Sequence, residues 1–393
     1  MADLYAPDHC DLCGSRDWSS LPMHEYAYGM WSDSRMSPRP LRKRVCTQCG
    51  LVRDGNAFSA EELSDHYADA YQLNTVDETC EHHFFVDGRA LARSEAIARW
   101  MFDALGPPDR DRPVSSIYEV GAGQGRLLRR FAAQYPHARI AGCEPNRRAA
   151  AVASRDWFQV TAGDERTMDG VYDLIVASFV LEHVPSPTTF LRRLAAHLSP
   201  SGRLVVAQPM QDVESHDIYF VDHLHHFSVT HVDWAANRAG LVTLATRRAP
   251  WFAPNASVHV LTRGDVEPAV SYVAPAAIAR AVARWEAVFA SCRALPPRRY
   301  ALFGGSEFAG LLRCYGALER LDLRIVLDDM PERYPDGVFG RPVRSLDALT
   351  GDEDERFDAV ILALNPVYHA SVARRCAARG FAVVNPFAAA QSV

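Results

Sequence analysis

The sequence lacks the features that would place the protein in a membrane or on a nucleic acid. It has no low-complexity tract, and no apolar run approaches the length of a membrane-spanning helix. It also lacks an excess of positive charge: 42 Lys and Arg stand against 48 Asp and Glu, which argues against general nucleic-acid binding. The start of the chain, Met1 to Asp8, is acidic and without the apolar core of a signal peptide. We therefore expect a cytoplasmic protein with neither membrane nor nucleic-acid partners.

The cysteines are distributed in a way that does not favour disulfide bonds. Nine are present, and five of them are scattered singly, whereas Cys10, Cys13, Cys46 and Cys49 form two Cys-x-x-Cys pairs, each followed by glycine. Four thiolates in this arrangement suit tetrahedral zinc and leave no open position for catalysis. We expect a structural Zn2+ here. Unrelated thiols remain an alternative, and a redox pair has less support because neither pair opens a helix in a βαβ pattern.

A strand, a tight turn and the start of a helix are predicted where the chain reads Ser-Ile-Tyr-Glu-Val-Gly-Ala-Gly-Gln-Gly-Arg, residues 116–126. Gly121, Gly123 and Gly125 allow the backbone to turn sharply and to approach a ligand at the helix N-terminus. A dinucleotide fingerprint would have its last glycine three residues on, so this spacing differs from it. A nucleotide-like cofactor is expected at the turn.

The acid Glu119 and the glycine spacing resemble the first motif of class I S-adenosylmethionine (SAM)-dependent methyltransferases. The next strand, Arg139 to Glu144, ends in an acid nineteen residues beyond Gly125, where a carboxylate can accept both ribose hydroxyls. A buried strand, a helix, a Pro-x-Gly turn and a further strand follow between residues 172 and 208, in the order typical of that family. The resemblance implies SAM as cofactor, with contacts from Glu119, Gly121, Gly123, Gly125, Glu144, Asp164 and Ser178.

At 393 residues the chain is long enough for two or three domains. We expect a zinc-binding domain over residues 1–76, a methyltransferase domain over 77–268 with two antiparallel strands at its edge, and a Rossmann-like substrate-binding domain over 269–393. The fold class is α/β throughout the two larger domains. The turn at Gly304 and Gly305 in the last domain could hold a phosphate or could be only a tight turn.

Two loops that follow strands of the predicted core carry histidines. His183 follows the fourth strand, and Asp222, His223, His225 and His226 follow the fifth. Ligands of open α/β sheets collect beyond the carboxyl ends of the strands, and histidine can accept a proton near neutral pH. We expect His223, with Asp222 beside it, to act as a base, His183 to be the second candidate, and His225 and His226 to cap loops or helices. A catalytic metal remains an alternative, although neighbouring histidines in an extended loop point in different directions.

The three-part organisation resembles the sugar C-methyltransferases that act on nucleotide-linked keto-deoxysugars. The resemblance covers nearly the whole chain: the paired Cys-x-x-Cys motifs, the methyltransferase core and the smaller C-terminal α/β domain. It implies a TDP-linked 4-keto sugar as small-molecule substrate, bound between the core and the C-terminal domain, in natural-product or polysaccharide biosynthesis. It also implies that a histidine removes the proton next to the ketone, that neighbouring donors hold the enolate oxygen, and that the carbanion attacks the methyl group of SAM. His223, His183 and Asp222 are the residues to which these roles would fall.

The sequence departs from that family at three positions. Phe220 and Asp222 stand where the family usually has tyrosine and glutamate, and Phe179 stands where it tends to have asparagine. The stretch His-Leu-His-His-Phe-Ser, residues 223–228, also resembles methyltransferases of polysaccharide and natural-product clusters, many of which would methylate oxygen. O-methylation of a sugar or other small-molecule hydroxyl is therefore the alternative, and a non-catalytic SAM-binding scaffold is a third possibility. The sequence leaves the identity of the sugar and the oligomeric state open.

Overall fold

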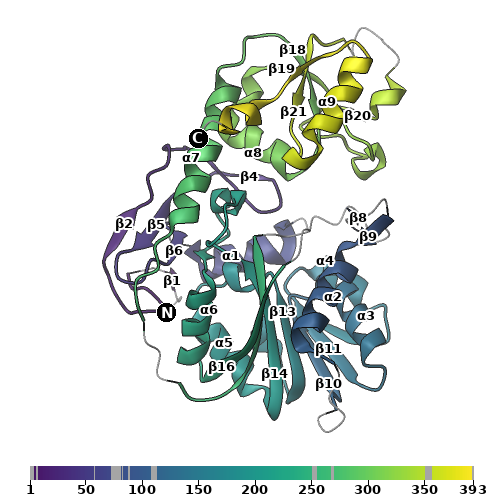
Figure 1. Cartoon of the computed structure of the whole chain (residues 1–393). Coiled ribbons are helices and arrows are strands. Elements are labelled where there is room, and N and C mark those ends of the chain that lie inside the picture. Colours follow the sequence, from purple (N-terminus) through teal and green to yellow (C-terminus); the bar gives the residue numbers. More distant parts are fainter. Residues whose placement is uncertain are drawn as a thin grey trace. The chain divides into compact units, whose positions relative to one another are not determined.

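The computed structural model describes residues 4–5, 8–56, 58–71, 81, 83–86, 89–107, 113–249, 255–266, 270–349 and 356–391. These residues form two compact units (Figure 1). Unit 1 comprises Met1–Leu21, Lys43–Ser215 and Asp222–Ile278, and unit 2 comprises Pro22–Arg42, His216–Val221 and Ala279–Val393. Within the described ranges, no helix is both long and apolar enough to cross a membrane. The domain boundaries expected at residues 77 and 269 stay predictions.

A mixed sheet of seven strands forms the centre of unit 1, in the order β12-β11-β10-β13-β14-β17-β16. The first five strands run parallel. β17 pairs antiparallel with β14, and β16 pairs antiparallel with β17, which gives the antiparallel edge that the sequence predicted. The strands are β10 (Ser116–Val120), β11 (Arg139–Glu144), β12 (Gln159–Ala162), β13 (Tyr172–Ser178), β14 (Leu198–Pro209), β16 (Leu241–Arg248) and β17 (Ala256–Arg263).

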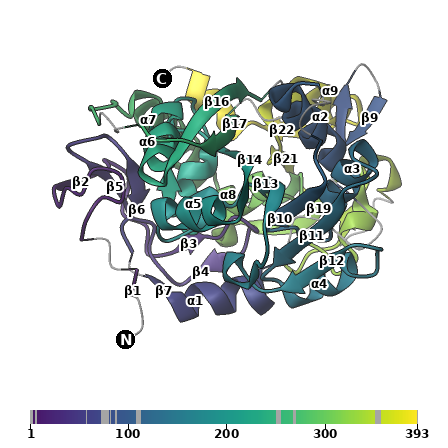
Figure 2. The same cartoon turned by 90° about the horizontal axis from the view of Figure 1, so that it is seen from below.

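Helices cover both faces of this sheet, which explains why its central strands are continuous apolar runs (Figure 2). On one face Leu174 and Val176 pack with apolar residues of α2 (Arg93–Leu105), α3 (Arg126–Gln134) and α4 (Arg147–Ala153). On the other face Ile175 and Ala177 pack with apolar residues of α5 (Pro187–Ala196) and α6 (Val229–Arg238). Successive residues of β13 therefore serve opposite faces of the core.

The cysteine-bearing segment contributes a small antiparallel sheet to unit 1, in the order β15-β6-β5-β2. These strands are β2 (Trp18–Ser20), β5 (Lys43–Cys46), β6 (Val52–Asp54) and β15 (His225–His226), so the edge strand comes from the histidine loop. Unit 1 also contains β1 (Leu4–Tyr5), β7 (Phe58–Ser59), α1 (Ala60–Asp65), a π-helical turn His66–Ala70, β8 (His83–Val86), β9 (Arg89–Ala92) and two 3-10 helices, Glu165–Thr167 and Leu181–His183.

Unit 2 is built on a second sheet of five parallel strands, in the order β20-β19-β18-β21-β22. Its strands are β18 (Arg299–Phe303), β19 (Asp322–Leu327), β20 (Val343–Arg344), β21 (Ala359–Leu362) and β22 (Ala382–Val384). Its helices are most of α7 (Ala276–Arg293), α8 (Glu307–Gly316) and α9 (His369–Ala378), and residues 22–42 add the hairpin β3 (Gly29–Met30) and β4 (Met36–Ser37). The parallel sheet confirms the expected second α/β fold.

Candidate functional site

The glycine turn lies between β10 and α3. Gly121, Gly123 and Gly125 have φ angles of 73°, 54° and 73°, in the left-handed region that side chains other than glycine rarely adopt. A Cβ atom at Gly121 would also lie only 2.7 Å from a methyl carbon of Val180. The backbone of the turn therefore requires glycine, and it passes close to the loop that follows β13.

The carboxylate at the end of β11 closes this turn. Glu144 Oε2 accepts the backbone N–H of Gly123 at 2.7 Å, and its Oε1 accepts the backbone N–H of Asn146, also at 2.7 Å. Burial raises the pKa of Glu144, and the two N–H donors oppose that effect. Each carboxylate oxygen retains a second lone pair, so Glu144 can still accept hydrogen bonds from the hydroxyls of a ligand.

Glu119 places a second carboxyl group beneath the turn. Its side chain is buried, and its Oε2 has no hydrogen-bond partner among the residues the structure describes. Burial, and to a lesser degree the Glu144 carboxylate, raises the pKa of Glu119 well above its ordinary value. A buried carboxyl oxygen of this kind would be satisfied by a cationic donor such as the ammonium group of SAM. The turn, Glu119 and Glu144 therefore fit the cofactor that the sequence implies.

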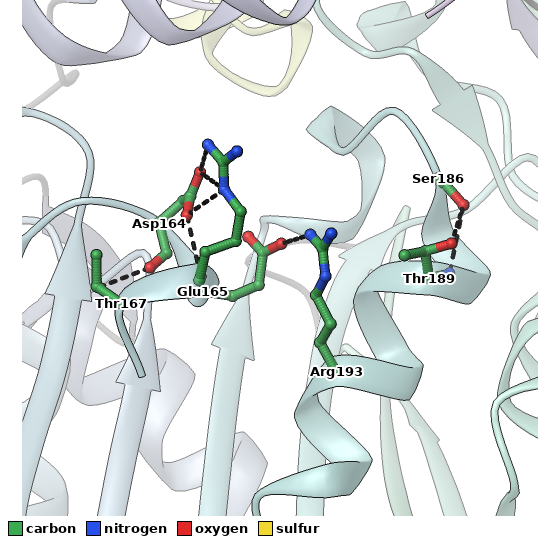
Figure 3. A network of polar contacts seen from close by, with 7 residues as sticks. Asp164, Glu165, Thr167, Ser186, Thr189 and Arg193 are labelled. Atoms are coloured by element: carbon green, nitrogen blue, oxygen red, sulfur yellow. Dashed lines mark hydrogen bonds and ion pairs between the residues drawn. The ribbon is translucent and has the colours of Figure 1, made fainter. Parts of the chain in front are cut away.

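Asp164 lies after β12, where it begins a short 3-10 helix. Its backbone carbonyl accepts the Thr167 hydroxyl at 2.7 Å, and beside it Arg193 of α5 binds Glu165 at 2.7 Å (Figure 3). Arg166 binds the Asp164 carboxylate, with Nη2 2.6 Å from Oδ2. Burial would raise the pKa of Asp164, but the Arg166 contacts outweigh it and lower the pKa. Asp164 is therefore ionised and can accept hydrogen bonds. A ligand bound to its carboxylate would share that carboxylate with Arg166.

Ser178, the last residue of β13, is half-buried. It lies at the same carboxyl edge of the sheet as Val120 and Glu144, the last residues of β10 and β11. The residues expected to contact the cofactor therefore come from the ends of neighbouring parallel strands, the edge at which open α/β sheets bind ligands.

The two histidine-bearing loops meet in unit 1. His183 belongs to a short 3-10 helix, Leu181–His183, and its ring centroid lies 4.9 Å from that of His223, with the rings at 87°. His183 Nδ1 is 2.9 Å from the backbone carbonyl oxygen of Asp222 and 3.7 Å from the Asp222 carboxylate. The structure thus brings together the three residues to which the sequence assigned the chemistry.

The surroundings of His183 keep its ring neutral. A carbonyl oxygen only accepts hydrogen bonds, so the contact with the Asp222 carbonyl assigns the ring proton to Nδ1 and leaves the lone pair on Nε2. Burial lowers the pKa of His183 to about 4, although the Asp222 carboxylate acts in the opposite direction. Nε2 lies 4.0 Å from Glu182 Oε1. A neutral imidazole of this kind can accept a proton.

Tyr67 is a member of this group that the sequence did not single out as catalytic. Its hydroxyl lies 2.9 Å from His183 Nδ1 and 3.5 Å from Asp222 Oδ2. Burial, followed by the Asp222 carboxylate, raises the pKa of Tyr67 well above its ordinary value, so the hydroxyl stays protonated. The available signal was the spacing of Tyr67 and Tyr71, four residues apart on one helical face, which suggested only a core or lid residue.

The histidine cluster and the glycine turn lie side by side. Val180, which approaches Gly121, directly precedes the 3-10 helix that carries His183. From the other direction, the Asn146 side chain donates to the backbone carbonyl of Tyr71 at 3.1 Å, so the segment with Tyr67 is bound next to Glu144. A methyl donor at the turn and an acceptor at the histidines would therefore be neighbours.

The remaining histidines of the second loop have a structural position. His225 and His226 form β15 and pair with Arg53 and Val52 of β6. The His225 side chain also hydrogen-bonds the backbone of Val184, in the loop that carries His183. Burial, followed by Arg53, lowers the pKa of His225 well below its ordinary value. A metal could be held by residues of both histidine-bearing loops, because Glu182, His183 and His223 offer atoms within 4.8 Å of one another.

The four paired cysteines converge as expected. Sγ atoms of Cys10 and Cys49 lie 3.5 Å apart, as do those of Cys13 and Cys46, and all four lie within 4.8 Å of one another. After each pair the glycine donates its backbone N–H to the carbonyl of the first cysteine, at 2.8 Å in both knuckles. This four-cysteine cluster is consistent with structural zinc.

The turn after β18 in unit 2 repeats the hydrogen-bond pattern of the first turn. Asp328, which follows β19, accepts the backbone N–H of Gly305 at 3.3 Å through Oδ2, and that of Met330 at 3.0 Å through Oδ1. Gly304 has a φ of 106°, and a Cβ there would lie 2.5 Å from the carbonyl oxygen of Ala363. The glycine is thus required by the close approach of the loop after β21.

Comparison with known proteins finds similarity in the central part of the chain. Residues 91–246 match the family model described as "Methyltransferase domain". Trans-aconitate 2-methyltransferase of Deinococcus radiodurans is 29% identical over 132 residues, which are 33% of this chain and 48% of the relative. The protein of the same name from Azoarcus sp. (strain BH72) is 27% identical over 175 residues, 43% of this chain and 62% of the relative. The chain thus spans between 48% and 62% of the length of these curated relatives.

Among solved structures, the mitomycin 7-O-methyltransferase MmcR aligns at 17% identity and a TM-score of 0.36, covering 44% of this chain and 53% of that one. The plantazolicin methyltransferase BpumL, in complex with an analogue of its substrate and S-adenosylhomocysteine (SAH), aligns at 15% identity and a TM-score of 0.36, covering 44% of this chain and 83% of that one.

Proposed function

We propose that the chain, whose residues 91–246 form a class I methyltransferase domain, is a SAM-dependent methyltransferase of a small molecule. Its reaction would be C-methylation next to the ketone of a nucleotide-linked keto-deoxysugar, in natural-product or polysaccharide biosynthesis. The observation that carries the proposal is the pair of histidines, His183 and His223, with ring centroids 4.9 Å apart beside the glycine turn. The curated relatives are named for a small acid, which supports a small-molecule acceptor.

In this mechanism the residues of the chain move one proton and hold one developing charge. Bound SAM supplies a methyl group on a sulfonium centre. His223 removes the proton from the carbon next to the ketone, so that the C–H electron pair passes into the enolate and the proton stays on the ring. Tyr67 contributes an O–H group beside His183, which can stabilise the enolate oxygen. General base catalysis of this kind accelerates a reaction by roughly 10²- to 10⁴-fold.

O-methylation of a sugar hydroxyl or another small-molecule hydroxyl is the second candidate. Phe220 stands where the sugar C-methyltransferases usually have a tyrosine, so this position lacks the hydroxyl that could donate to an enolate oxygen. O-methylation needs only a base, or positioning, at an acceptor hydroxyl, and His223 could serve it equally well. A non-catalytic SAM-binding scaffold has less support because His183 and His223 lie beside the turn that carries Glu119 and Glu144.

We assign the remaining parts of the chain supporting roles. The zinc-binding segment, residues 1–76, would be structural, and residues 269–393 would bind the substrate. The Gly305–Asp328 contact in unit 2 supports the second assignment, since it repeats the arrangement of Gly123 and Glu144 in the cofactor turn.

Product analysis tests the proposal. The purified protein would be incubated with methyl-labelled SAM and a panel of TDP-linked 4-keto sugars and their reduced counterparts, and the products read by mass spectrometry and carbon NMR. A labelled methyl on a sugar carbon next to the ketone is the expected result. A labelled methyl group on oxygen would favour the second candidate function, O-methylation. Binding of SAM without methyl transfer to any panel member would rule out nucleotide-linked keto sugars as the substrate class.

A further inference from the structure

We propose that Lys43 of the cysteine-bearing segment is a positioning residue for the methyl transfer, because its ammonium group fixes the backbone that carries His223. The inference rests on the proposed function for its kinetic part. It adds to that function a residue 180 positions away in sequence from His223, on the strand that ends in Cys46 of the second cysteine pair.

The contact itself is direct and fully buried. Lys43 Nζ donates to the backbone carbonyl oxygen of His223 at 2.9 Å. The same Nζ lies 3.4 Å from Asp54 Oδ2, and the side chains of Lys43 and Asp54 are both 0% exposed. The ammonium group therefore joins one strand of the small sheet to the histidine loop, with no competition from solvent for the hydrogen bond.

Asp54 is placed to compensate the buried charge. It is the register partner of Lys43 across β5 and β6, and its Oδ1 accepts both the backbone N–H of Asn56 at 2.7 Å and the Asn56 side chain at 2.8 Å. Its own backbone N–H donates to the carbonyl oxygen of Leu224 at 3.0 Å. The carbonyls of His223 and Leu224 are thus both anchored to the small sheet before β15 begins its pairing with β6.

A role in positioning explains why an ion pair occupies this place. Burying two charges costs solvation free energy, and well-packed apolar residues often stabilise a fold as well or better. Lys43 instead supplies a directional N–H at a backbone carbonyl, which restrains the peptide plane after His223 and with it the direction of the ring. Nζ donates to the backbone carbonyl of His223, so its effect on the chemistry would pass through the peptide that carries the His223 ring.

Replacement of Lys43 tests the role. Lys43→Met should lower kcat about a hundredfold, as expected for a misplaced catalytic group, while the Kd for SAM changes less than about twofold because the glycine turn is untouched. The double variant Lys43→Met/Asp54→Asn removes both charges and keeps a side-chain oxygen that can accept from Asn56. It therefore leaves no unpaired buried charge that could prevent folding, and its kcat should stay low. Val45→Ala is the matched control, since it removes buried methyl groups from the same strand and leaves the Lys43 side chain in place, and its kcat should stay near the wild-type value.

Recovery of wild-type kcat in the double variant would overturn the proposal, because Lys43 would then matter only through charge balance. Hydrogen–deuterium exchange separates this outcome from a failure of the proposed function. If the wild-type protein transfers no methyl group, amides 223–226 should still exchange faster in Lys43→Met and in the double variant than in Val45→Ala. Equal exchange in all three variants would overturn the positioning role irrespective of activity.

Discussion

The ring of His223 is the group on which the proposed chemistry depends most directly. His223→Ala should lower turnover by at least about 10²-fold, since it removes the proposed general base, while SAM binding should remain nearly intact because the proposed cofactor contacts, Glu119 and Glu144, are unchanged. Steady-state kinetics and calorimetric titration with SAM measure the two effects separately. Unchanged turnover would remove His223 as the base and leave His183 as the candidate.

His183 carries a pH dependence whose sign follows from its pKa of about 4, against an ordinary 6.5. Above pH 6.5 the ring is neutral in the folded and unfolded chains, so it contributes no pH dependence there. Between pH 6.5 and 4 the unfolded chain binds a proton that the folded chain does not, and the free energy of unfolding therefore falls as the pH falls, by about 3 kcal/mol over the whole window.

The variant His183→Gln isolates this contribution from that of the other buried histidines. Urea unfolding at pH 7 and at pH 4.5 should show a smaller loss of stability in the variant than in the wild-type protein. An identical loss in both proteins would mean that His183 titrates near its ordinary pKa.

At the scale of elements, the turn between β10 and α3 depends on a carboxylate from the next strand. Glu144→Ala removes the acceptor of the Gly123 N–H and the proposed acceptor of the ribose hydroxyls, so the Kd for SAM should rise by about tenfold or more. Asp156→Ala is a suitable control, since Asp156 pairs with Arg129 near the surface. Normal SAM affinity in Glu144→Ala would contradict the assignment of β11 as the cofactor strand.

The elements that the sequence predicted well are those with a strong local pattern. The apolar runs of β10, β13 and β14, each followed by a turn or loop, were recognisable because strands buried on both faces carry few polar residues. The glycine turn was recognisable because positive φ angles select glycine. The converging cysteines followed from their paired spacing, which reflects the geometry of a metal site rather than that of the fold.

The elements that the sequence did not reveal depend on contacts between distant segments. His225 and His226 pair with β6, and nothing local distinguishes this two-residue strand from a loop. Tyr67 reaches His183 across 116 positions, so its spacing with Tyr71 indicated only a helical face. Lys43 is fully buried, whereas lysine is usually exposed, and its partner Asp54 is identified only once β5 and β6 are paired.

At the scale of the whole molecule, the cysteine cluster is part of the core of unit 1. Cys10, Cys46 and Cys49 belong to the same buried cluster as apolar residues of β13, α5 and α6. Asp11, between the first two cysteines, accepts the Thr188 N–H at 2.7 Å and the Ser186 hydroxyl at 2.8 Å, at the start of α5. Ser186 also caps this helix by accepting the Thr189 N–H at 3.3 Å (Figure 3).

The second knuckle contacts α6 in the same way, since His231 Nε2 lies 3.0 Å from the backbone carbonyl oxygen of Cys49. α5 follows the loop with His183, and α6 follows the loop with His223. Each knuckle therefore holds the helix that comes directly after one of the two histidine-bearing loops, and a metal that joins the knuckles would fix both loops relative to one another.

Removal of zinc should consequently affect the whole of unit 1 rather than its first residues alone. Chelation is expected to lower the melting temperature by more than about 5 °C and to abolish turnover, because the four thiolates would repel one another and release the two knuckles from α5 and α6. Metal analysis, calorimetry and kinetics on the same sample measure this. Cys10→Ser should reproduce the effect, whereas Cys376→Ser, a buried thiol of unit 2, should leave the zinc content unchanged. Complete loss of metal with an unchanged melting temperature would contradict the structural role, since a cluster embedded in the core cannot lose its cross-link without a cost in stability.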